Sequence, residues 1–506
     1  MPITDLLKHG KDEATAIGGV EGAKPLTYAG LRQLASRTIA RLNELGIGRG
    51  DRVAIVAPNG PEMAAAFMCI GAGAVTAPLN PAYRSDEFEF YLNDLRSKAL
   101  VVERGMQTPA REIAKKLSIP IIELVPQRAE GAGSFTLEPV DTLTGKAAKN
   151  GPAEDGDEAL VLHTSGTTSR PKIVPLLQRN LMATAKHISQ AVALKPDDIC
   201  LNIMPLFHIH GLMAAVLSSL NAGAAVVCTP GFNALKFFGW LEEVKPTWYT
   251  AVPTMHQAIL SRAQRNLEIV ARSRLRLIRS SSSSLPPQVM AELEKTFRAP
   301  VIESYGMTEA SHQMASNPLP PRARKAGFVG VAAGPEIGIM DERNKLLAAG
   351  EIGEIVIRGP NVTPGYEANP EANAKAFTAG WFRTGDQGSI DGEGYLQLTG
   401  RLKELINRGG EKISPVEVDV VLMDHPSVAQ CVTFAVPHDK LGEEVAAAVV
   451  LREGTTATER ELRDFAATKL ADYKVPRKIV LLAEIPKGAT GKLQRIGLAQ
   501  KLGLAK

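Results

Sequence analysis

A short segment after Leu162 gathers side chains that could bind phosphate. It holds five hydroxyls, one glycine and two cations, in the order Thr164, Ser165, Gly166, Thr167, Thr168, Ser169, Arg170, Pro171 and Lys172. Hydroxyl and N–H groups donate hydrogen bonds to phosphate oxygens, glycine lets the backbone approach closely, and lysine balances the charge. The order is not that of a Walker A loop. The segment is a candidate polyphosphate loop, with a flexible polar loop as the alternative.

Three further charged residues lie in turns or loops. Glu309 follows Thr308 in a turn-like segment, where its carboxylate could hold Mg²⁺. Asp386 follows Gly385 and could accept hydrogen bonds from two hydroxyls, although Gly-Asp pairs are also common in ordinary turns. Lys492 lies on a glycine-flanked loop that could deliver a point charge, and an exposed lysine in a basic tail is the competing interpretation.

The order T-S-G-T-T-x-x-P-K resembles the phosphate loop of the adenylate-forming superfamily, which includes acyl-CoA synthetases, peptide-synthetase adenylation domains and firefly-type luciferases. Four further segments resemble motifs of this superfamily in the right order: Tyr305–Glu309, Gly385–Asp386, Gly400–Glu404 and Pro486–Lys492. Chance does not explain agreement with five motifs of this superfamily, in order, over more than three hundred residues.

The resemblance implies an enzyme that uses ATP to make an acyl-adenylate from a carboxylic acid, and then a thioester with coenzyme A. Two anions meet in the first step, and a like-charge pair about 4 Å apart costs roughly 4 kcal/mol at a surface-like dielectric constant. Positive charge must therefore converge on the reacting atoms. By resemblance Lys492 supplies it as the catalytic lysine, and Glu309 holds Mg²⁺ against the departing pyrophosphate.

The resemblance also assigns the nucleotide pocket. Tyr305 would stack on adenine, Asp386 would bind the ribose hydroxyls, and Arg401 would bind ribose or phosphate. A buried structural tyrosine is the alternative for Tyr305. The expected ATP-binding residues are Thr164, Ser165, Gly166, Thr167, Thr168, Lys172, Glu303, Ser304, Tyr305, Gly306, Thr308, Asp386, Arg401 and Lys492.

Polar side chains dominate the segments expected to contact the acid. His208, in Pro205–Gly211, resembles the histidine that borders the acyl carboxylate in acyl-CoA synthetases, and a structural histidine is the alternative. Arg279 precedes the serine run Ser280–Ser284, and His312 follows Glu309 by three positions. Left unpaired around an alkyl chain, such groups would cost about 1 to 3 kcal/mol each. A short, polar, dicarboxylic acid is therefore expected, contacted by His208, Ser280, Ser282 and His312.

The segments Asn317–Pro320 and Glu404–Pro415, and the chain as a whole, resemble the oxalate-CoA ligase branch, so oxalate is the leading substrate hypothesis. Ile173 departs from the glycine usual in relatives, which puts catalytic efficiency in question. The alternatives are a ligase for malonate or for a short fatty or aromatic acid, an adenylation enzyme that loads a carrier protein, a luciferase-like oxygenase, and a nucleotide sensor without turnover.

Helical and strand patterns alternate from Thr27 to Ile122 and again after the break at Gly151–Asp157, which predicts an α/β fold of two doubly wound layers. Residues from about 329 to 400 predict short strands and a small β-barrel. The expected domains are residues 1–400, which bind AMP, and residues 401–506, a small mobile α+β domain with the catalytic lysine. By resemblance Lys403 is the hinge, and Asn407–Lys412 would face the thiol tunnel after rotation.

Composition narrows the class of protein further. A chain of 506 residues is too long to fold around one compact core, so two or more domains are expected. The net charge of +4 argues against nucleic acid as a partner. The four cysteines are scattered, no segment reaches membrane-spanning length, and Met1–Lys11 does not resemble a secretory signal. We therefore expect a cytoplasmic monomer or homodimer with ATP, Mg²⁺ and coenzyme A as ligands.

Overall fold

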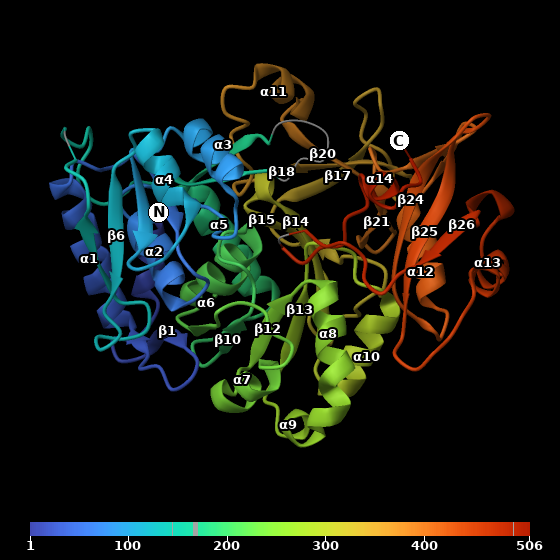
Figure 1. The fold of residues 1–506 in the computed structure, drawn as a ribbon, viewed down its shortest axis with the longest axis horizontal. Helices are drawn as coiled ribbons and strands as arrows, with labels where there is room; N and C mark the ends of the chain where they lie inside the picture. Colours follow the sequence, from blue (N-terminus) through green and yellow to red (C-terminus); the bar gives the residue numbers. More distant parts are fainter. Residues whose placement is uncertain (144, 165–170, 489, 506) are drawn as a thin grey trace.

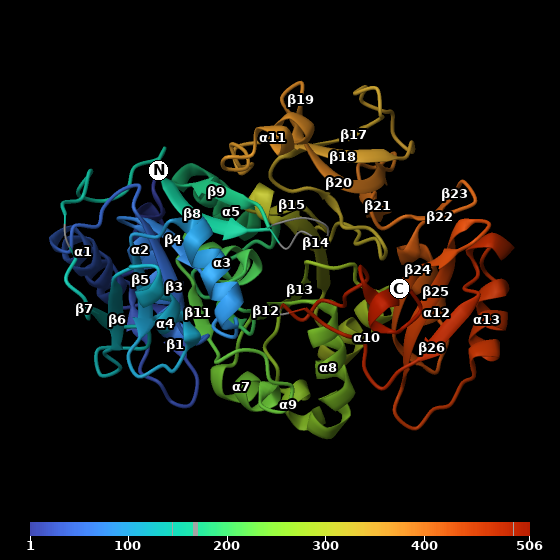
Figure 2. The same ribbon diagram turned by 45° about the horizontal axis from the view of Figure 1, so that its top comes forward.

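The computed structural model describes residues 1–143, 145–164, 171–488 and 490–505. Two large α/β sheets lie side by side, a small antiparallel sheet lies against them, and an α+β unit follows at the C-terminal end (Figures 1 and 2). Long buried runs in the central strands explain this layering, because parallel strands covered by helices on both faces are apolar throughout.

The first sheet has seven strands in the order β7-β6-β5-β3-β4-β8-β9. Its inner strands are parallel and its edge strands β7 and β9 are antiparallel to their neighbours. The strands are β3 (Arg52–Val56), β4 (Val75–Pro78), β5 (Ala99–Glu103), β6 (Ile121–Pro126), β7 (Phe135–Pro139), β8 (Glu158–His163) and β9 (Ile173–Leu177). Its helices are α1 (Tyr28–Glu44), α2 (Pro61–Gly71), α3 (Ser85–Leu95) and α4 (Pro109–Lys116).

The second sheet has nine strands in the order β16-β15-β14-β13-β12-β10-β11-β1-β2. The run from β14 through β10 and β11 to β1 is parallel. The strands are β1 (Thr15–Gly19), β2 (Leu26–Thr27), β10 (Ile199–Asn202), β11 (Ala225–Cys228), β12 (Trp248–Ala251), β13 (Leu277–Ser280), β14 (Val301–Met307), β15 (His312–Ser316) and β16 (Val331–Ala332). The associated helices are α5 (Gln178–Ala191), the π-helix η2 (His210–Leu217), α6 (Ser218–Asn221), α7 (Phe237–Val244), α8 (Pro253–Ala263), α9 (Leu267–Ala271) and α10 (Pro287–Phe297).

The two smaller sheets complete the fold. The predicted β module is a five-stranded antiparallel sheet of β17 (Glu336–Met340), β18 (Gly353–Arg358), β19 (Phe377–Thr378), β20 (Trp381–Ile390) and β21 (Leu396–Arg401), with helix α11 (Pro370–Ala376) beside it. The C-terminal sheet contains β22 (Ile406–Arg408), β23 (Glu411–Ile413), β24 (Val428–His438), β25 (Gly442–Leu451) and β26 (Lys478–Leu481), with helices α12 (Pro415–Met423), α13 (Glu459–Ala467) and α14 (Leu498–Lys501). The short helices η1 (Ile3–Lys8), η3 (Gln264–Asn266), η4 (Thr308–Ala310) and η5 (Asp472–Lys474) lie between these elements.

The predicted α/β class and the two layers are confirmed, but the layers do not divide the chain where its composition changes. Strand β8 follows the break at Gly151–Asp157 and yet pairs with β4 of the first sheet. Strand β1, at the start of the chain, pairs with β11 of the second sheet. Among the described residues, no helix combines the length and the apolar character that a membrane crossing would require.

Candidate active site

Predicted site residues and neighbours that were not predicted gather where parallel strands of the second sheet end. His208 and His210 follow β10, Thr250 lies near the end of β12, and Arg279 and Ser280 end β13. The carboxyl ends of neighbouring parallel strands meet at one edge of a sheet, which is where ligands bind in open α/β folds. Residues separated in the sequence are therefore close in space.

Tyr305 and Asp386 are joined directly, since the Tyr305 hydroxyl donates a hydrogen bond to Asp386 Oδ2. Arg401 Nε donates to Asp386 Oδ1 at 3.1 Å. Asp386 and Arg401 are opposite one another on the antiparallel strands β20 and β21, which explains this second contact. Burial raises the pKa of the Asp386 carboxyl. The three residues form one polar group between β14 and the β17–β21 sheet.

Glu303 lies deeper in β14. Its Oε1 accepts the backbone N–H of Leu285 at 2.8 Å, and its Oε2 has no hydrogen-bond partner among the described residues. Burial raises the pKa of Glu303 to about 8. The neighbouring Ser304 hydroxyl donates to the Ser280 carbonyl at 3.2 Å, so strands β13 and β14 are joined at this depth by side chains as well.

Gly306 allows the chain to turn tightly after these residues. A Cβ atom at this position would lie 1.5 Å from the carbonyl oxygen of His312. Only glycine therefore permits β14 and β15 to approach so closely here. The turn that follows carries Thr308 and Glu309 in helix η4 and returns the chain at His312.

The candidate phosphate loop connects the antiparallel strands β8 and β9. Its base is closed by two hydrogen bonds, from the Thr164 N–H to the Lys172 carbonyl at 2.9 Å and from the Lys172 N–H to Thr164 Oγ1 at 3.2 Å. The predicted loop residues Ser165, Gly166, Thr167 and Thr168 lie outside the described residues. Ile173, the departure from the family pattern, begins β9 with its side chain buried against the β3–β5 core.

Tyr366 links the candidate phosphate loop to the candidate metal residue, and its only signal in the sequence was an aromatic residue after Pro364-Gly365. Its hydroxyl donates to Glu309 Oε1 at 2.8 Å, and the Lys172 ammonium lies 4.3 Å from the centre of its ring. Burial raises the pKa of Glu309, while the Tyr366 hydrogen bond and the Lys172 charge oppose the rise. Tyr366 is thus a site residue that sequence reasoning missed.

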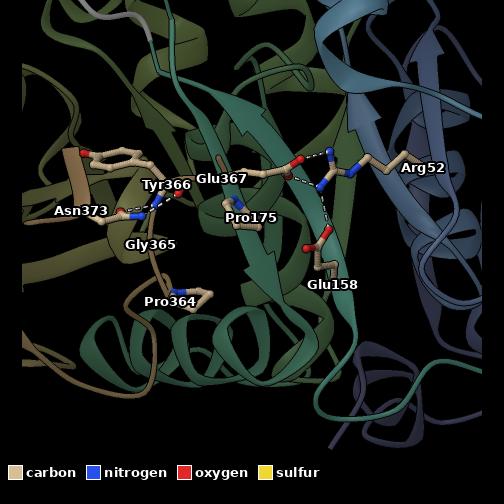
Figure 3. Close-up of a pocket in the computed structure, with 8 residues that line it drawn as sticks. All are labelled: Arg52, Glu158, Pro175, Pro364, Gly365, Tyr366, Glu367 and Asn373. Carbon is tan, nitrogen blue, oxygen red and sulfur yellow. Dashed lines mark hydrogen bonds and ion pairs between the residues drawn. The ribbon is translucent and has the colours of Figure 1, made fainter. Parts of the chain in front are cut away.

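Figure 3 shows how Tyr366 is held. Asn373 pairs with its backbone, accepting the N–H at 2.7 Å and donating to the carbonyl at 2.8 Å. The next residue, Glu367, forms an ion pair with Arg52, which also binds Glu158 at 3.1 Å. These contacts fix the segment to the first sheet. The pocket that they line has a volume of about 350 Å³ and contains none of the predicted site residues.

Lys492 reaches the same region from the C-terminal part of the chain. A red segment before α14 extends from the C-terminal sheet to the centre of the molecule in both Figures 1 and 2. Its Gly491 carbonyl accepts a hydrogen bond from Thr254 Oγ1 at 2.6 Å. Burial and the charge of Arg401 lower the pKa of Lys492 to about 8. The lysine loop is therefore docked on helix α8.

Three imidazoles, here called the histidine cluster (His208, His210 and His312), lie close to the Lys492 ammonium. Burial and that charge lower the pKa of His208 to about 3. His208 Nδ1 accepts the His210 backbone N–H at 3.3 Å, so its proton is on Nε2. The rings of His210 and His312 stack at 4.9 Å. The cluster is neutral and offers N–H donors.

Arg279, Thr250 and Gln313 lie beneath the histidine cluster. Arg279 is fully buried and donates to Thr250 Oγ1 at 3.3 Å, to His312 Nε2 at 3.2 Å and to Gln313 Oε1 at 3.2 Å. His210 bonds Thr250 Oγ1 at 2.6 Å and Ser282 Oγ at 3.0 Å. Sequence reasoning noted Arg279 as a polar residue but gave it no role, and it did not include Thr250, His210 or Gln313. The second histidine of His208-Ile209-His210 was the available signal.

Other predicted features lie outside this cluster. Lys403 follows β21 in the turn that leads to the C-terminal sheet. Asn407–Lys412 forms the β22–β23 hairpin, whose exposed tip is at the surface. Among the described residues, no group of three or more His, Cys, Asp and Glu side chains could hold a metal. A single buried carboxylate fits Mg²⁺, which binds through one or two carboxylates and phosphate oxygens of the substrate.

Comparison with known proteins identifies the class. Residues 7–367 match the family model of the AMP-binding enzyme, and residues 417–492 match that of the AMP-binding enzyme C-terminal domain. The chain belongs to the AMP-binding enzyme family.

Individual relatives are similar over nearly the whole chain. The chain is 47% identical to an oxalate–CoA ligase of Arabidopsis thaliana, covering 95% of this chain and 94% of that protein. It is 43% identical to an oxalate–CoA ligase of Saccharomyces cerevisiae, covering 89% of this chain and 87% of that protein. Its fold matches ATP-bound MatB from Rhodopseudomonas palustris with a TM-score of 0.87 at 29% identity, covering 100% and 98% of the chains. For apo MatB the TM-score is 0.79. The chain is an ATP-dependent, AMP-forming acid–CoA ligase.

Proposed function

We propose that the acid is oxalate, which is joined to coenzyme A through an enzyme-bound oxalyl-adenylate. The observation that carries this proposal is the polar cluster next to Lys492: three neutral imidazoles, Ser280 and Ser282, with a buried arginine beneath them. An alkyl chain could not satisfy these groups, whereas the four oxygens of a small dicarboxylate can. The similarity to two oxalate–CoA ligases supports the same acid.

In the first half-reaction, an oxalate carboxylate attacks the α-phosphate of ATP and pyrophosphate leaves. Lys492 provides positive charge at the carboxylate and α-phosphate oxygens, and the His208 Nε2–H donates to the attacking carboxylate. Glu309 holds Mg²⁺, which neutralises the departing phosphates when it is bound. Asp386 and Arg401 bind the ribose, Tyr305 packs on adenine beside Glu303, Ser304 and Gly306, and Thr164, Lys172 and Thr308 bind phosphate. The closed base of the β8–β9 loop supports the role of its ends.

The second half-reaction needs a different arrangement, because a thiol must reach the site that Lys492 occupies. We propose that residues 401–506 rotate about Lys403 as one domain relative to residues 1–400, whose segment of about 329–400 is the β-barrel. The higher similarity to ATP-bound than to apo MatB supports the arrangement described here as the adenylating one. Asn407–Lys412 would then face the thiol after rotation. The four free, buried cysteines suit a cytoplasmic location, and we propose a monomer or homodimer.

ATP–pyrophosphate exchange over a panel of acids tests the substrate. Oxalate should support the fastest exchange, ahead of malonate, acetate, octanoate and benzoate, and addition of coenzyme A should yield oxalyl-CoA and AMP. Malonate is the second candidate because it too is a small dicarboxylate, whose four oxygens could satisfy the same polar groups. Strong exchange with octanoate and none with oxalate would reject the proposal, and a product formed only with a carrier protein would reject coenzyme A as the acceptor.

A further inference from the structure

Arg279 is a buried cation without a counter-charge. Its side chain is fully buried on β13, and no carboxylate lies within ion-pairing distance in the part of the chain that the structure describes. Its three hydrogen-bond partners, Thr250, His312 and Gln313, are neutral, and its Nε–H has no partner there. The neighbouring Ser280 hydroxyl, also buried, has none either. A buried charge is costly unless it is paired, so this place is suited to bind an anion.

Two paths of successive hydrogen bonds start at Arg279, and the first of them ends at His312. An arginine has only donors, so His312 Nε2 must be the acceptor in their 3.2 Å contact. The proton of this neutral imidazole is then on Nδ1. His312 therefore presents an N–H donor on the side of the ring away from Arg279, and it does so in a backbone conformation with φ of 100°. That conformation is rare outside glycine and is typical of functional sites.

The second path ends at Ser282. Thr250 is fully buried and accepts from Arg279, so its own hydroxyl proton goes to its other partner, His210 Nε2, at 2.6 Å. The His210 proton is then on Nδ1 and is donated to Ser282 Oγ at 3.0 Å. The hydroxyl proton of Ser282 remains to be donated to a ligand. Ser282 is partly exposed and has φ of 74°, again in the left-handed region.

Both paths begin at one cation and end in donors, and the histidine cluster that carries them borders Lys492. We propose that Arg279 is the positioning residue for the second carboxylate of the substrate, which accepts hydrogen bonds from the Ser282 hydroxyl and His312 Nδ1–H and neutralises the buried charge. This inference rests on the proposed function and extends it to a substrate class: small acids with a second anionic group. The carboxylate that is adenylated lies toward Lys492.

The test compares KM for oxalate with the inhibition constant of acetate, which lacks the second carboxylate, in ATP–pyrophosphate exchange. Arg279→Met should raise KM for oxalate by roughly a hundredfold, the typical effect of removing one partner of a buried charged contact. The acetate constant should change less than about twofold, because acetate makes no contact that depends on this group. Arg279→Lys, which keeps the charge, should recover part of the loss. Equal losses for the two acids would overturn the inference.

The matched control is Arg276→Met on the same segment of chain. Arg276 pairs with Asp198 at 2.6 Å, so its loss should lower the melting temperature and leave the ratio of the two constants unchanged. If Arg279→Met does not fold, Thr250→Val and Ser282→Ala decide instead. Each should raise KM for oxalate by about tenfold, and the double variant should lose no more than one of them because they interrupt the same path. Independent, multiplying losses would contradict the path.

Failure of this inference and failure of the proposed function give different results. A wild-type enzyme that exchanges with malonate and not with oxalate would refute oxalate, while loss of malonate binding in Arg279→Met would still support the role of Arg279. A wild-type enzyme that exchanges with oxalate, together with an unchanged KM in Arg279→Met, would refute the role of Arg279 alone.

Discussion

Lys492 and Glu303 show how position changes the chemistry of single residues. Lysine and glutamate side chains in water have pKa values near 10.5 and 4.5, so both are charged at neutral pH. Burial brings both pKa values to about 8. The lysine thus loses its charge within reach of ordinary assay conditions, and the buried carboxyl keeps its proton. Both shifts give pH dependences that can be measured.

The adenylation step should weaken at high pH because Lys492 loses its proton. Its ammonium is present below its pKa of about 8 and is lost above it. The kcat/KM for pyrophosphate exchange should therefore fall about tenfold for each pH unit above that value, since kcat/KM reports the free enzyme. Thioester formation from supplied acyl-adenylate should show no such fall.

Lys492→Ala should lower the rate of pyrophosphate exchange by about a hundredfold or more and abolish its decrease at high pH, while sparing the second half-reaction. Equal loss of both half-reactions would contradict the assignment.

Glu303 should make the fold less stable as pH rises. The native state holds the Glu303 proton up to a pKa of about 8, whereas the unfolded chain releases it above 4.5. Between these values the native state binds more protons, so the free energy of unfolding falls by up to about 1.4 kcal/mol per pH unit. Glu303→Gln, which mimics the neutral form, should melt close to wild type at about pH 5 and above it at about pH 8. If the melting temperatures of wild type and Glu303→Gln changed in parallel with pH across this range, Glu303 would not titrate in this way.

At the scale of elements, strands β14 and β15 determine where the chemical groups lie. Their antiparallel pairing places Met307 opposite His312, with helix η4 and Glu309 in the turn between them. Strands β12 and β13 bring Thr250 beside Arg279 in register. One tight turn and one parallel pair thus position the candidate metal residue and the candidate acid-binding residues together.

Gly306→Ala should disrupt this turn. The new methyl group would lie 1.5 Å from the His312 carbonyl oxygen, a backbone atom that cannot move alone. We expect a loss of about 1–3 kcal/mol in the free energy of unfolding, with loss of exchange activity because Glu309 and His312 shift. Denaturant unfolding and pyrophosphate exchange measure the two effects.

The control for this substitution is Gly239→Ala in helix α7. Among the described residues, no atom beyond the chain neighbours and the backbone of the same helix lies within 4 Å of the added methyl group, so the variant should be as stable as wild type or gain about 0.5–1 kcal/mol from the lower entropy cost of alanine in a helix. A stable, active Gly306→Ala enzyme would mean that β14 and β15 are not this close.

At the scale of the whole molecule, the C-terminal unit is docked both by polar contacts and by a hydrophobic cluster to which the two parts of the chain contribute. Thr254 bonds the Gly491 carbonyl, Gln257 donates to the Ala429 carbonyl at 3.1 Å, and Gln288 bonds Asp424. A guanidinium nitrogen of Arg452 lies 3.9 Å from Glu292 Oε2. These polar contacts are the ones that the proposed rotation would break and re-form.

Thr254→Val should shift the molecule away from the adenylating arrangement. The valine keeps the shape and removes one hydrogen bond to the lysine loop, worth about 1 kcal/mol or roughly fivefold in population. Pyrophosphate exchange should slow by up to that factor, while thioester formation from supplied acyl-adenylate should be unchanged or faster. Ser261→Ala, on the same helix, removes a hydroxyl that, among the described residues, donates to the Ala258 carbonyl alone, and it should change neither rate. A loss in both half-reactions would contradict a purely conformational role.

The sequence by itself determined the fold class, the order of motifs and most of the nucleotide and metal candidates. Alternating helical and strand patterns identify parallel sheets, and short motifs such as Tyr305–Glu309 specify a local backbone shape that neighbouring residues are sufficient to encode. Lys492 was predicted from the resemblance of Pro486–Lys492 to the catalytic-lysine motif of the family.

Only the tertiary structure decided which residues support these candidates. Tyr366 reaches Glu309 across 57 positions of the chain, and His210 reaches Thr250 across 40. The same holds for the assignment of β1 and β8 to their sheets. Contacts between distant segments depend on how strands are ordered in space, and no local pattern in this chain encodes that order. The uncompensated charge of Arg279 is a property of its burial, and burial exists only in the folded molecule.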